Sequence, residues 1–280
     1  LAGIAAGAII PSWGWQGIFV AVGRGSAIMF PMIWLALPES VGFLLTRQPR
    51  GALARANRIL AAQGLASLAT LPPKPSAAQR APVTQLLRAN FRRATLLLWG
   101  SFFASFFTLY FLTSWIPRIA VGAGYALETA FLGSAAFNAG AFFGLIALGW
   151  FASRLNLTGL IGVFFALSAA AMVAFGAQHT PDLTFYLGLI VIGFLVQGGF
   201  GGLYAVAAAV YPVEMKTTGV GWSIGIGRLG AVAGPVVGGL TLSAGFGVLA
   251  NFAIFAVPMV LAAILTLALA HARQTALAQT

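Results

Sequence analysis

The sequence has no cysteine and very few acidic residues. Only four of its 280 residues are acidic: Glu39, Glu128, Asp182 and Glu214. Without cysteine there is no disulfide framework, thiol nucleophile or thiolate metal ligand. The two histidines are far apart in sequence, and the common metalloprotease, hydrolase and phosphate-binding motifs do not occur. We therefore expect that the chain is not an enzyme and that it uses no metal ion or organic cofactor.

Charge of either sign is scarce in this strongly apolar chain. Hydrophobic residues make up 60% of the sequence and charged residues 7%, and the mean hydropathy is +0.96. A soluble domain carries about 25% charged residues, so lipid must cover most of the surface of this chain. The formal net charge of +11 does not indicate a nucleic-acid partner, because the cations are confined to short stretches between apolar runs.

Long apolar runs predict an all-α membrane protein with about eight transmembrane helices. A hydrocarbon core about 30 Å thick needs roughly 20 apolar residues in a helix. We interpret residues 1–10 as the end of a helix whose beginning is missing. Seven full spans follow: 17–37, 94–116, 127–152, 157–177, 183–210, 218–243 and 246–270.

One long polar segment, 38–93, separates the first two spans from the last six. It contains nine cations: Arg47, Arg50, Arg55, Arg58, Lys74, Arg80, Arg88, Arg92 and Arg93. The positive-inside rule places this segment in the cytoplasm, and threading the later spans puts Arg154, Lys216 and Arg273 on the same side, against Arg118 outside. We predict a multi-pass inner-membrane protein with a cytoplasmic C-terminus, divided into 1–37, 38–93 and 94–280.

Two interpretations of the polar segment remain open. It is either a solvated linker, or it carries short amphipathic helices over 52–68 and 83–93 that rest on anionic lipid. A proline-rich stretch between them, from Pro72 to Pro82, predicts flexibility.

Arg228 is the most informative single residue. It lies ten residues into the span 218–243, which places it near the middle of the membrane. An arginine there costs about 2.5–3.5 kcal/mol on insertion scales, and no acid lies near the middle of a predicted span to neutralise it, since Glu128 is only the second residue of 127–152. Its partner is therefore a carboxylate from helices outside this sequence, a substrate anion, or backbone carbonyls with water.

Other polar and aromatic residues recur at helical spacing. Ser134 and Asn138 share one face of the span 127–152, and Gln197 and Tyr204 share a face of the span 183–210. In the span 94–116 an aromatic stripe contains Phe103, Phe107 and Tyr110. Such a stripe is either a packing surface or a ligand wall. Together with Arg228 these groups offer what an aromatic carboxylate needs, a cation for the anion and rings for stacking.

The region from Tyr211 to Pro235 carries a family resemblance. It reads YPVEMKTTGVGW, continues with GIGRLGA after two residues, and ends in Gly234-Pro235. This run resembles the aromatic acid:proton symporters, a branch of the major facilitator superfamily. Gly14-Trp15-Gln16 and Leu37-Pro38-Glu39-Ser40 resemble the halfway region of the same family. The resemblance covers essentially the whole chain, from the fifth to the twelfth helix of a twelve-helix fold.

The resemblance implies two six-helix halves with a substrate site between them at the midplane. It also implies that Arg228 and Lys216, which stands where arginine is usual, matter for transport. We assign Lys216, Glu214 and Arg154 to gating and coupling. The chain departs from the family pattern at Ser153, where the loop motif G-x-x-x-D-R has aspartate, and at Gln16, where arginine is common.

The leading hypothesis is symport of a benzoate-like, hydroxybenzoate-like or phenylpropanoate-like anion with a proton, driven by the proton gradient in a monomeric protein. Arg228 would hold the carboxylate or stabilise a gating acid. Asn138, Gln197 and Tyr204 would bind ring substituents, and Phe107 and Tyr110 would flank the ring. The alternatives are a sugar, other organic-acid or drug porter of the same superfamily, and a non-transporting sensor or fragment.

Overall fold

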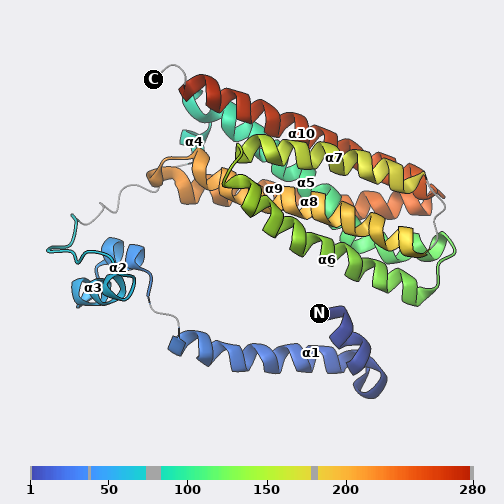
Figure 1. Ribbon diagram of the computed structural model, residues 1–280, viewed down its shortest axis with the longest axis horizontal. Coiled ribbons are helices and arrows are strands. Elements are labelled where there is room, and N and C mark those ends of the chain that lie inside the picture. The colour runs from blue at the N-terminus through green and yellow to red at the C-terminus, as the bar shows by residue number, and fades with distance from the viewer. Residues whose placement is uncertain (1, 37–38, 74–82, 178–181, 278–280) are drawn as a thin grey trace. The chain divides into compact units, whose positions relative to one another are not determined.

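The computed structural model describes residues 2–36, 39–73, 83–177 and 182–277, which form helices α1 to α10 (Figure 1). The chain divides into two compact units, Leu1–Gln79 and Arg80–Thr280. Part of the predicted proline-rich stretch, including Lys74, Pro75 and Pro82, lies outside the described residues, as does His179.

Seven helices of the described chain are long and apolar enough to cross a membrane, and each corresponds to one predicted full span. The segments are Gln16–Ala36, Asn90–Gly122, Leu127–Ala152, Leu157–Gly176, Leu183–Val210, Met215–Ser243 and Val248–His271. The prediction of an all-α membrane bundle is confirmed. The largest boundary difference is at 94–116, where the helix runs from Ala89 to Gly122 and so includes the polar residues Asn90, Arg92 and Arg93 at its start.

The first unit begins with α1 (Ala2–Ala36), which is kinked at Gly14. Gly14 has φ 62°, a left-handed conformation that favours glycine. The predicted partial span 1–10 precedes this kink and belongs to α1, so it is not counted as a separate span.

The polar segment folds in part into a helical pair, α2 (Val41–Arg47) and α3 (Ala52–Ala62), around the buried residues Leu44, Ala52 and Ala56. Asn57 ties the returning chain to α3, since its side chain accepts from the Leu68 N–H at 2.8 Å and donates to the Leu68 carbonyl at 3.0 Å. The predicted helix over 52–68 ends early because Gly64 adopts φ 69° and the Leu65 N–H bonds back to the Leu60 carbonyl, which terminates the helix.

The second unit is a bundle of six long helices preceded by one short turn. Its elements are α4 (Val83–Leu86), α5 (Ala89–Gly122), α6 (Leu127–Ala152), α7 (Leu157–Gly176), α8 (Asp182–Val210), α9 (Val213–Ser243) and α10 (Val248–Leu277). The main packing partners are α5 with α9 and α10, α6 with α8, and α7 with α10 and α8. The predicted amphipathic helix over 83–93 is instead α4 followed by the start of α5.

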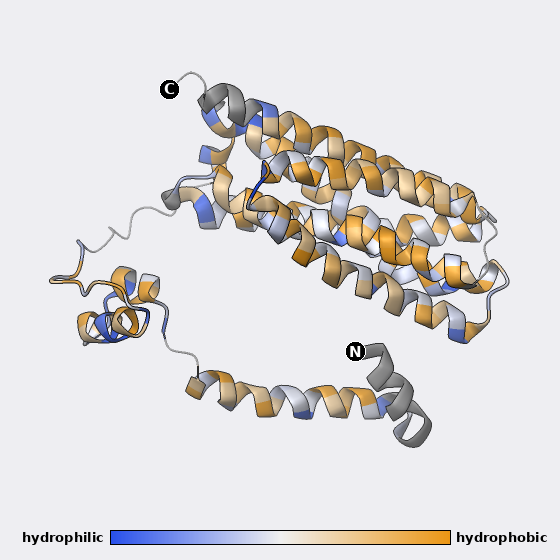
Figure 2. Cartoon of the chain, viewed as in Figure 1, coloured by the Kyte–Doolittle hydropathy of each residue, from blue (hydrophilic) through white to orange (hydrophobic). Residues whose placement is uncertain are grey.

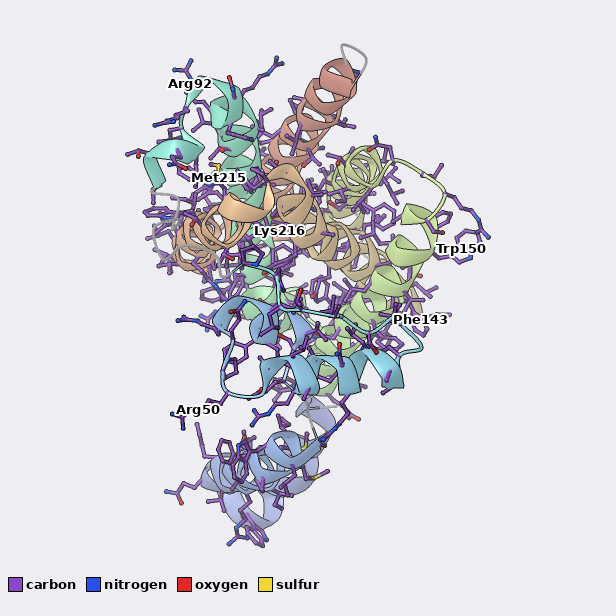
Figure 3. The ribbon with its side chains drawn as sticks, turned by 90° about the vertical axis from the view of Figure 1, so that its left-hand side faces the viewer. Arg50, Arg92, Phe143, Trp150, Met215 and Lys216 are labelled. Atoms are coloured by element: carbon purple, nitrogen blue, oxygen red, sulfur yellow. The ribbon has the colours of Figure 1, made fainter. Side chains whose placement is uncertain are left out.

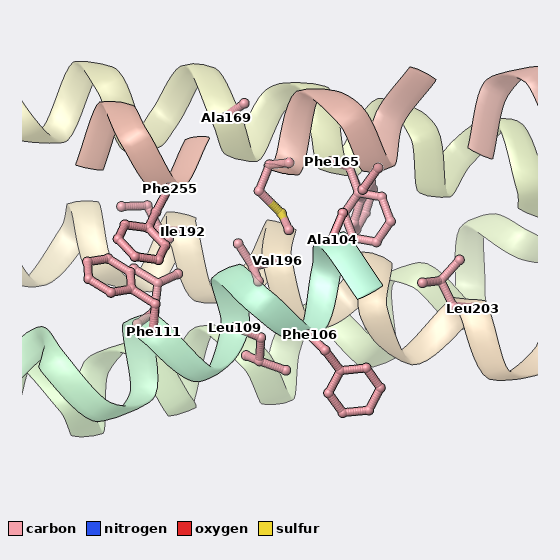
Figure 4. Packing of buried hydrophobic residues seen from close by; sticks show 14 of the residues in the cluster. Ala104, Phe106, Leu109, Phe111, Phe165, Ala169, Ile192, Val196, Leu203 and Phe255 are labelled. Atoms are coloured by element: carbon pink, nitrogen blue, oxygen red, sulfur yellow. The ribbon is translucent and has the colours of Figure 1, made fainter. Parts of the chain in front are cut away.

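The bundle core is rich in aromatic rings. Phe111 of α5 and Phe255 of α10 stack with their centroids 3.4 Å apart and their planes within 4°, as Figure 4 shows. Phe106, from the same helix, points away from that pair. Two hydroxyls connect α5 to α10, because Thr108 donates to the Phe255 carbonyl and Thr266 donates to Ser101. Helix α5 is thus held on one side by α10, and its other side faces α9 and α8.

Large apolar side chains cover the outside of this bundle. Phe143 is 59% exposed and Trp150 is 55% exposed, and both project from α6 in Figure 3. Hydrophobic residues dominate the middle of the long helices, and hydrophilic residues gather near their ends (Figure 2). An apolar surface this extensive is unstable in water and matches a lipid-facing bundle.

Within the second unit the described cations lie mostly toward one end of the bundle. Arg88, Arg92 and Arg93 flank the start of α5, Arg154 follows α6, and Lys216 is in the first turn of α9. Figure 1 shows the starts of α5 and α9 at the same end of the bundle. The opposite end has Arg118 and the acidic Glu128.

Candidate substrate-binding site

Glycines on α9 bring that helix against the backbone of α5. A Cβ atom added at Gly230 would collide with the Phe103 carbonyl oxygen, and one at Gly234 would collide with the Phe107 carbonyl oxygen. Small residues at this spacing allow membrane helices to approach closely. The contact fixes the register of the two helices, so that Arg228 lies opposite Tyr110.

Arg228 interacts with two groups on α5. Its Nη1 donates to the Tyr110 hydroxyl oxygen at 2.8 Å, and its Cζ atom lies 5.4 Å from the centroid of the Phe106 ring. Among the described residues the one salt bridge joins Arg55 to Glu39, so no described carboxylate neutralises Arg228. The side chain is exposed on the surface of the six-helix unit, near the middle of its span. The guanidinium therefore has further N–H donors for a ligand.

Five aromatic residues from α5 and α8 form a cluster beside this cation. The members of this aromatic cluster are Phe102, Phe106, Tyr110, Phe200 and Tyr204. Phe106 stacks on Tyr110 at 5.7 Å and meets Phe200 edge-to-face at 4.7 Å. Tyr204 makes edge-to-face contacts with Phe102 and Phe200, both at 5.4 Å. These offset and perpendicular geometries are the preferred ones for aromatic pairs.

The cluster contains two residues predicted from the sequence, Tyr110 and Tyr204. Phe102, Phe106 and Phe200 were not predicted as site residues. A signal for them was present, because Phe102, Phe106 and Tyr110 recur every four residues, as do Phe200 and Tyr204. The aromatic stripe predicted from the sequence shares Tyr110 with this cluster and otherwise runs through Phe103 and Phe107, the residues that follow Phe102 and Phe106 on α5.

Phe107 lies outside this cluster. Its ring stacks against Phe255 of α10 at 5.4 Å and tilts against Phe103 at 6.1 Å. In this position Phe107 packs the helices against one another and has no direct contact with Arg228 among the described interactions.

The two predicted amides lie on α6 and α8. Asn138 is exposed, and its Nδ2 donates to the Ser134 carbonyl oxygen at 2.8 Å. The Ser134 hydroxyl is buried and has no hydrogen-bond partner in the described part of the chain. Gln197 is half-buried near the middle of α8. Neither amide belongs to the aromatic cluster.

The predicted gating residues lie at the helix ends, away from Arg228. Lys216 is exposed in the first turn of α9, next to the buried Met215 (Figure 3), and the side chain of Glu214 lies outside those described. Arg154 places its Cζ atom 3.9 Å from the centroid of the Trp150 indole. Ser153, which replaces the usual aspartate, donates to the Trp150 carbonyl at 2.7 Å. Stacking on an indole is thus the contact that the structure gives Arg154.

Tyr211, at the junction of α8 and α9, is a further residue that sequence reasoning missed. It is buried, and its hydroxyl donates to Thr95 Oγ1 at 3.2 Å, while Thr95 donates to the Leu86 carbonyl at 2.9 Å. Burial raises the pKa of the Tyr211 phenol above its ordinary value, and hydrogen bonds with Thr95 and Ser223 oppose that shift. The chain of hydroxyls connects α4, α5 and the start of α9.

Comparison with known proteins identifies the family of this chain. The family model described as Major Facilitator Superfamily matches residues 1–200. The chain is 33% identical over 274 residues to a gallate transporter of Pseudomonas putida, covering 98% of this chain and 61% of that protein. It is 30% identical to a 4-hydroxybenzoate transporter of Pseudomonas putida, covering 85% and 54% of the two chains. A benzoate transport protein of Acinetobacter baylyi is 26% identical, with 90% and 54% covered.

The chain therefore spans somewhat more than half the length of these curated relatives. The matches confirm the resemblance found in the Tyr211–Pro235 run, and they agree with the expectation that the chain is not an enzyme, since the family and these relatives are transporters. On the family match and the helical bundle together, this chain belongs to the major facilitator superfamily.

Proposed function

We propose that this chain is part of a proton-coupled symporter that carries a small aromatic carboxylate across the inner membrane, and that Arg228 binds the carboxylate. The observation that carries the proposal is a guanidinium near mid-membrane that is bonded to a tyrosine hydroxyl and set beside five aromatic rings. The named relatives that carry gallate, 4-hydroxybenzoate and benzoate support this substrate class.

The geometry suits a ligand with an anionic end and a planar ring. The planar guanidinium binds a carboxylate through two parallel hydrogen bonds, which are stronger than neutral ones. Tyr110 keeps the Arg228 side chain in place through its 2.8 Å bond without neutralising it. A benzene ring attached to that carboxylate would then meet the half-buried rings of Phe200 and Tyr204, whereas Phe106 is buried and supports Phe200 through their edge-to-face contact. A sugar offers neither the negative charge nor the aromatic face that this arrangement matches.

The charge of the substrate is the reason for proposing proton coupling. A membrane potential that is negative inside opposes entry of an anion by about 2.3 kcal/mol per charge for every 100 mV. Entry together with one proton moves no net charge, so the pH gradient can then drive accumulation. We propose the same orientation as the cation distribution suggests, with the Arg88–Lys216 end of the bundle in the cytoplasm. Lys216, Glu214 and Arg154 would act there in gating, and we expect a monomer.

Uptake in cells that express the complete gene product tests the proposal. With labelled 4-hydroxybenzoate and gallate, we expect accumulation in cells with the unmodified protein. Arg228→Ala should abolish it, and Arg228→Lys should leave weak uptake, because an ammonium keeps the charge but loses the planar pair of bonds. Arg118→Ala, which removes a cation from a helix end, is the matched control and should transport normally.

Coupling of substrate entry to proton entry is tested separately, by the pH of the medium. In cells without a membrane potential, adding substrate should make the medium more alkaline as protons enter, and a protonophore should remove this signal. Normal accumulation by Arg228→Ala at equal membrane levels would contradict the assignment of Arg228. Uptake without any proton movement would contradict the coupling and leave the substrate class intact.

A further inference from the structure

The α6–α8 contact repeats the geometry of the α5–α9 contact. On α6, a Cβ atom added at Gly140 or Gly144 would collide with the carbonyl oxygen of Ile190 or Phe194 of α8. On α9, Gly230 and Gly234 meet the carbonyls of Phe103 and Phe107 of α5 in the same way. In each contact two glycines four residues apart lie against carbonyls that are also four residues apart, so each helix pair runs in parallel.

Two more pairs of contacts match when α5 is compared with α8 and α6 is compared with α9. In each of these pairs, the helix that supplies the large residue in one contact corresponds to the helix that supplies the glycine in the other. Gly227 of α9 lies against Phe106 of α5, and at the matching positions Gly193 of α8 lies against the Phe137 backbone of α6. Further along, Gly238 of α9 lies against Trp115 of α5.

The matching positions of that last contact are Gly202 of α8 and Leu148 of α6, which also touch. All four contacts therefore obey one correspondence, α5 with α8 and α6 with α9. Short loops make α5 and α9 run opposite to α6 and α8, so a half-turn about an axis in the membrane plane relates the two pairs. Transporter halves are often built from such inverted repeats.

This correspondence gives the Arg228–Tyr110 pair a counterpart. Arg228 stands two positions before Gly230, and Asn138 stands two positions before Gly140. Tyr110 stands three positions after Phe107, and Gln197 stands three positions after Phe194. Asn138 therefore takes the place of the cation and Gln197 takes the place of the tyrosine. Both amides lie near the middle of their spans, where polar groups are costly without a partner.

We infer that Asn138 and Gln197 form a second polar pole that binds hydroxyl groups on the substrate ring and makes the transporter selective for ring-hydroxylated carboxylates. The inference rests on the proposed function of Arg228. An amide carries no charge, so this pole is suited to a phenolic hydroxyl, which both donates and accepts, and not to a second carboxylate.

The hydrogen bonds of the Arg228–Tyr110 pair and of the Asn138–Gln197 pair support the assignment of the carboxylate to the first pair and of the ring hydroxyls to the second. Arg228 is bonded to Tyr110, whereas among the described interactions Asn138 donates to its own helix at Ser134 and makes no bond to Gln197. The unpartnered Ser134 hydroxyl is buried one turn from Asn138 on the same face. The second pole therefore has two amides that are not bonded to one another and that a ligand can use.

Selectivity among three substrates tests this inference. Uptake of benzoate, 4-hydroxybenzoate and gallate is compared in cells that express the complete gene product, as kcat/KM for each. Asn138→Leu and Gln197→Leu introduce apolar side chains of comparable size and remove the hydrogen bonds. We expect the unmodified protein to prefer the hydroxylated acids, and each variant to lose about 10-fold or more of that preference while benzoate uptake stays within about 2-fold.

Two controls separate this inference from its alternatives. Phe143→Leu on the outer side of α6 should leave the preference unchanged, and Arg228→Lys should lower uptake of all three acids together. Equal loss of benzoate and hydroxylated acids in the amide variants would overturn the inference, because it would show that the amides hold helices together. An unchanged preference would overturn it too. If the unmodified protein carries none of the three acids at normal membrane levels, the proposed function itself fails.

Discussion

Substituting Gly234 by alanine tests whether the close contact of α5 and α9 positions the site. The added methyl would collide with the Phe107 carbonyl oxygen, and a backbone oxygen cannot move aside as a flexible side chain can. The helices must separate by on the order of 1 Å to restore ordinary contact. Overpacking of this kind costs about 1–3 kcal/mol.

The same separation acts on the Arg228–Tyr110 bond, which spans these two helices. Its length is 2.8 Å, and N–H···O bonds weaken beyond about 3.2 Å, so an opening of that size breaks it. We therefore expect Gly234→Ala to lower the melting temperature of the purified protein and to weaken substrate binding. Gly122→Ala is the control, because a Cβ atom at Gly122 has nothing within 4 Å.

The melting temperature and the KM for 4-hydroxybenzoate, measured on both variants, test whether the close contact positions the site. Gly234→Ala should raise KM by about 10-fold or more, as expected for loss of a hydrogen bond to a charged group. If Gly234→Ala matches Gly122→Ala in both measurements, the helices do not approach as closely as the structure shows, and the positioning argument fails. A lower melting temperature with unchanged KM would refute the positioning role alone.

Three further predictions concern side chains that form hydrogen bonds. Tyr110→Phe should raise KM by about 10-fold while leaving expression unchanged; an unchanged KM would show that Arg228 is held by other groups. Because burial raises the pKa of Tyr211, the folded protein should lose stability as alkaline pH rises toward that pKa, and Tyr211→Phe should remove this loss in melts between pH 8 and about 11; an identical alkaline loss in both proteins would contradict this. Asn57→Ala should raise proteolysis near Leu68 without reducing uptake, since it removes two hydrogen bonds within the α2–α3 unit; unchanged digestion would argue against that fold.

The sequence predicted the helices well because the membrane imposes a strong constraint. A run as long and apolar as 127–152 indicates a helix, which satisfies its own backbone within lipid and needs about 20 residues to cross it, and the structure has the same bounds. The Gly64 helix end was harder to predict, because Gly64 terminates the helix through its φ of 69° and the Leu65–Leu60 bond. Local conformations of this kind are specified by a few atoms and not by apolar periodicity.

The candidate site was predictable only in part, for a geometric reason. Arg228 was prominent because a charge in an apolar span is rare. The choice between Phe106 and Phe107 as the residue nearest to it depends on the rotation of α5 about its axis. An apolar helix that is buried by protein on one side and covered by lipid on another has no polar face to reveal that rotation. The close contacts of Gly230 and Gly234 determine it, and they become visible only when both helices are placed.

The equivalence of Asn138 and Arg228 was also difficult to predict from the sequence, because the repeat is not evident when single helices are compared. A sequence comparison of α6 with α9 would align glycines, but Phe137 stands where Gly227 stands, and across the contact Gly193 stands where Phe106 stands. Each exchange looks like a mismatch in one helix, although the volume is compensated by the partner helix and the contact is preserved. The repeat is therefore recognised from pairs of contacting residues on different helices, and not from the sequence of one helix. The half-turn relates two contacts with the same packing, but a guanidinium stands at one of the related positions and an amide at the other. One end of the proposed site is therefore charged and the other is neutral. A hydroxylated aromatic carboxylate also has one charged end and one neutral polar end.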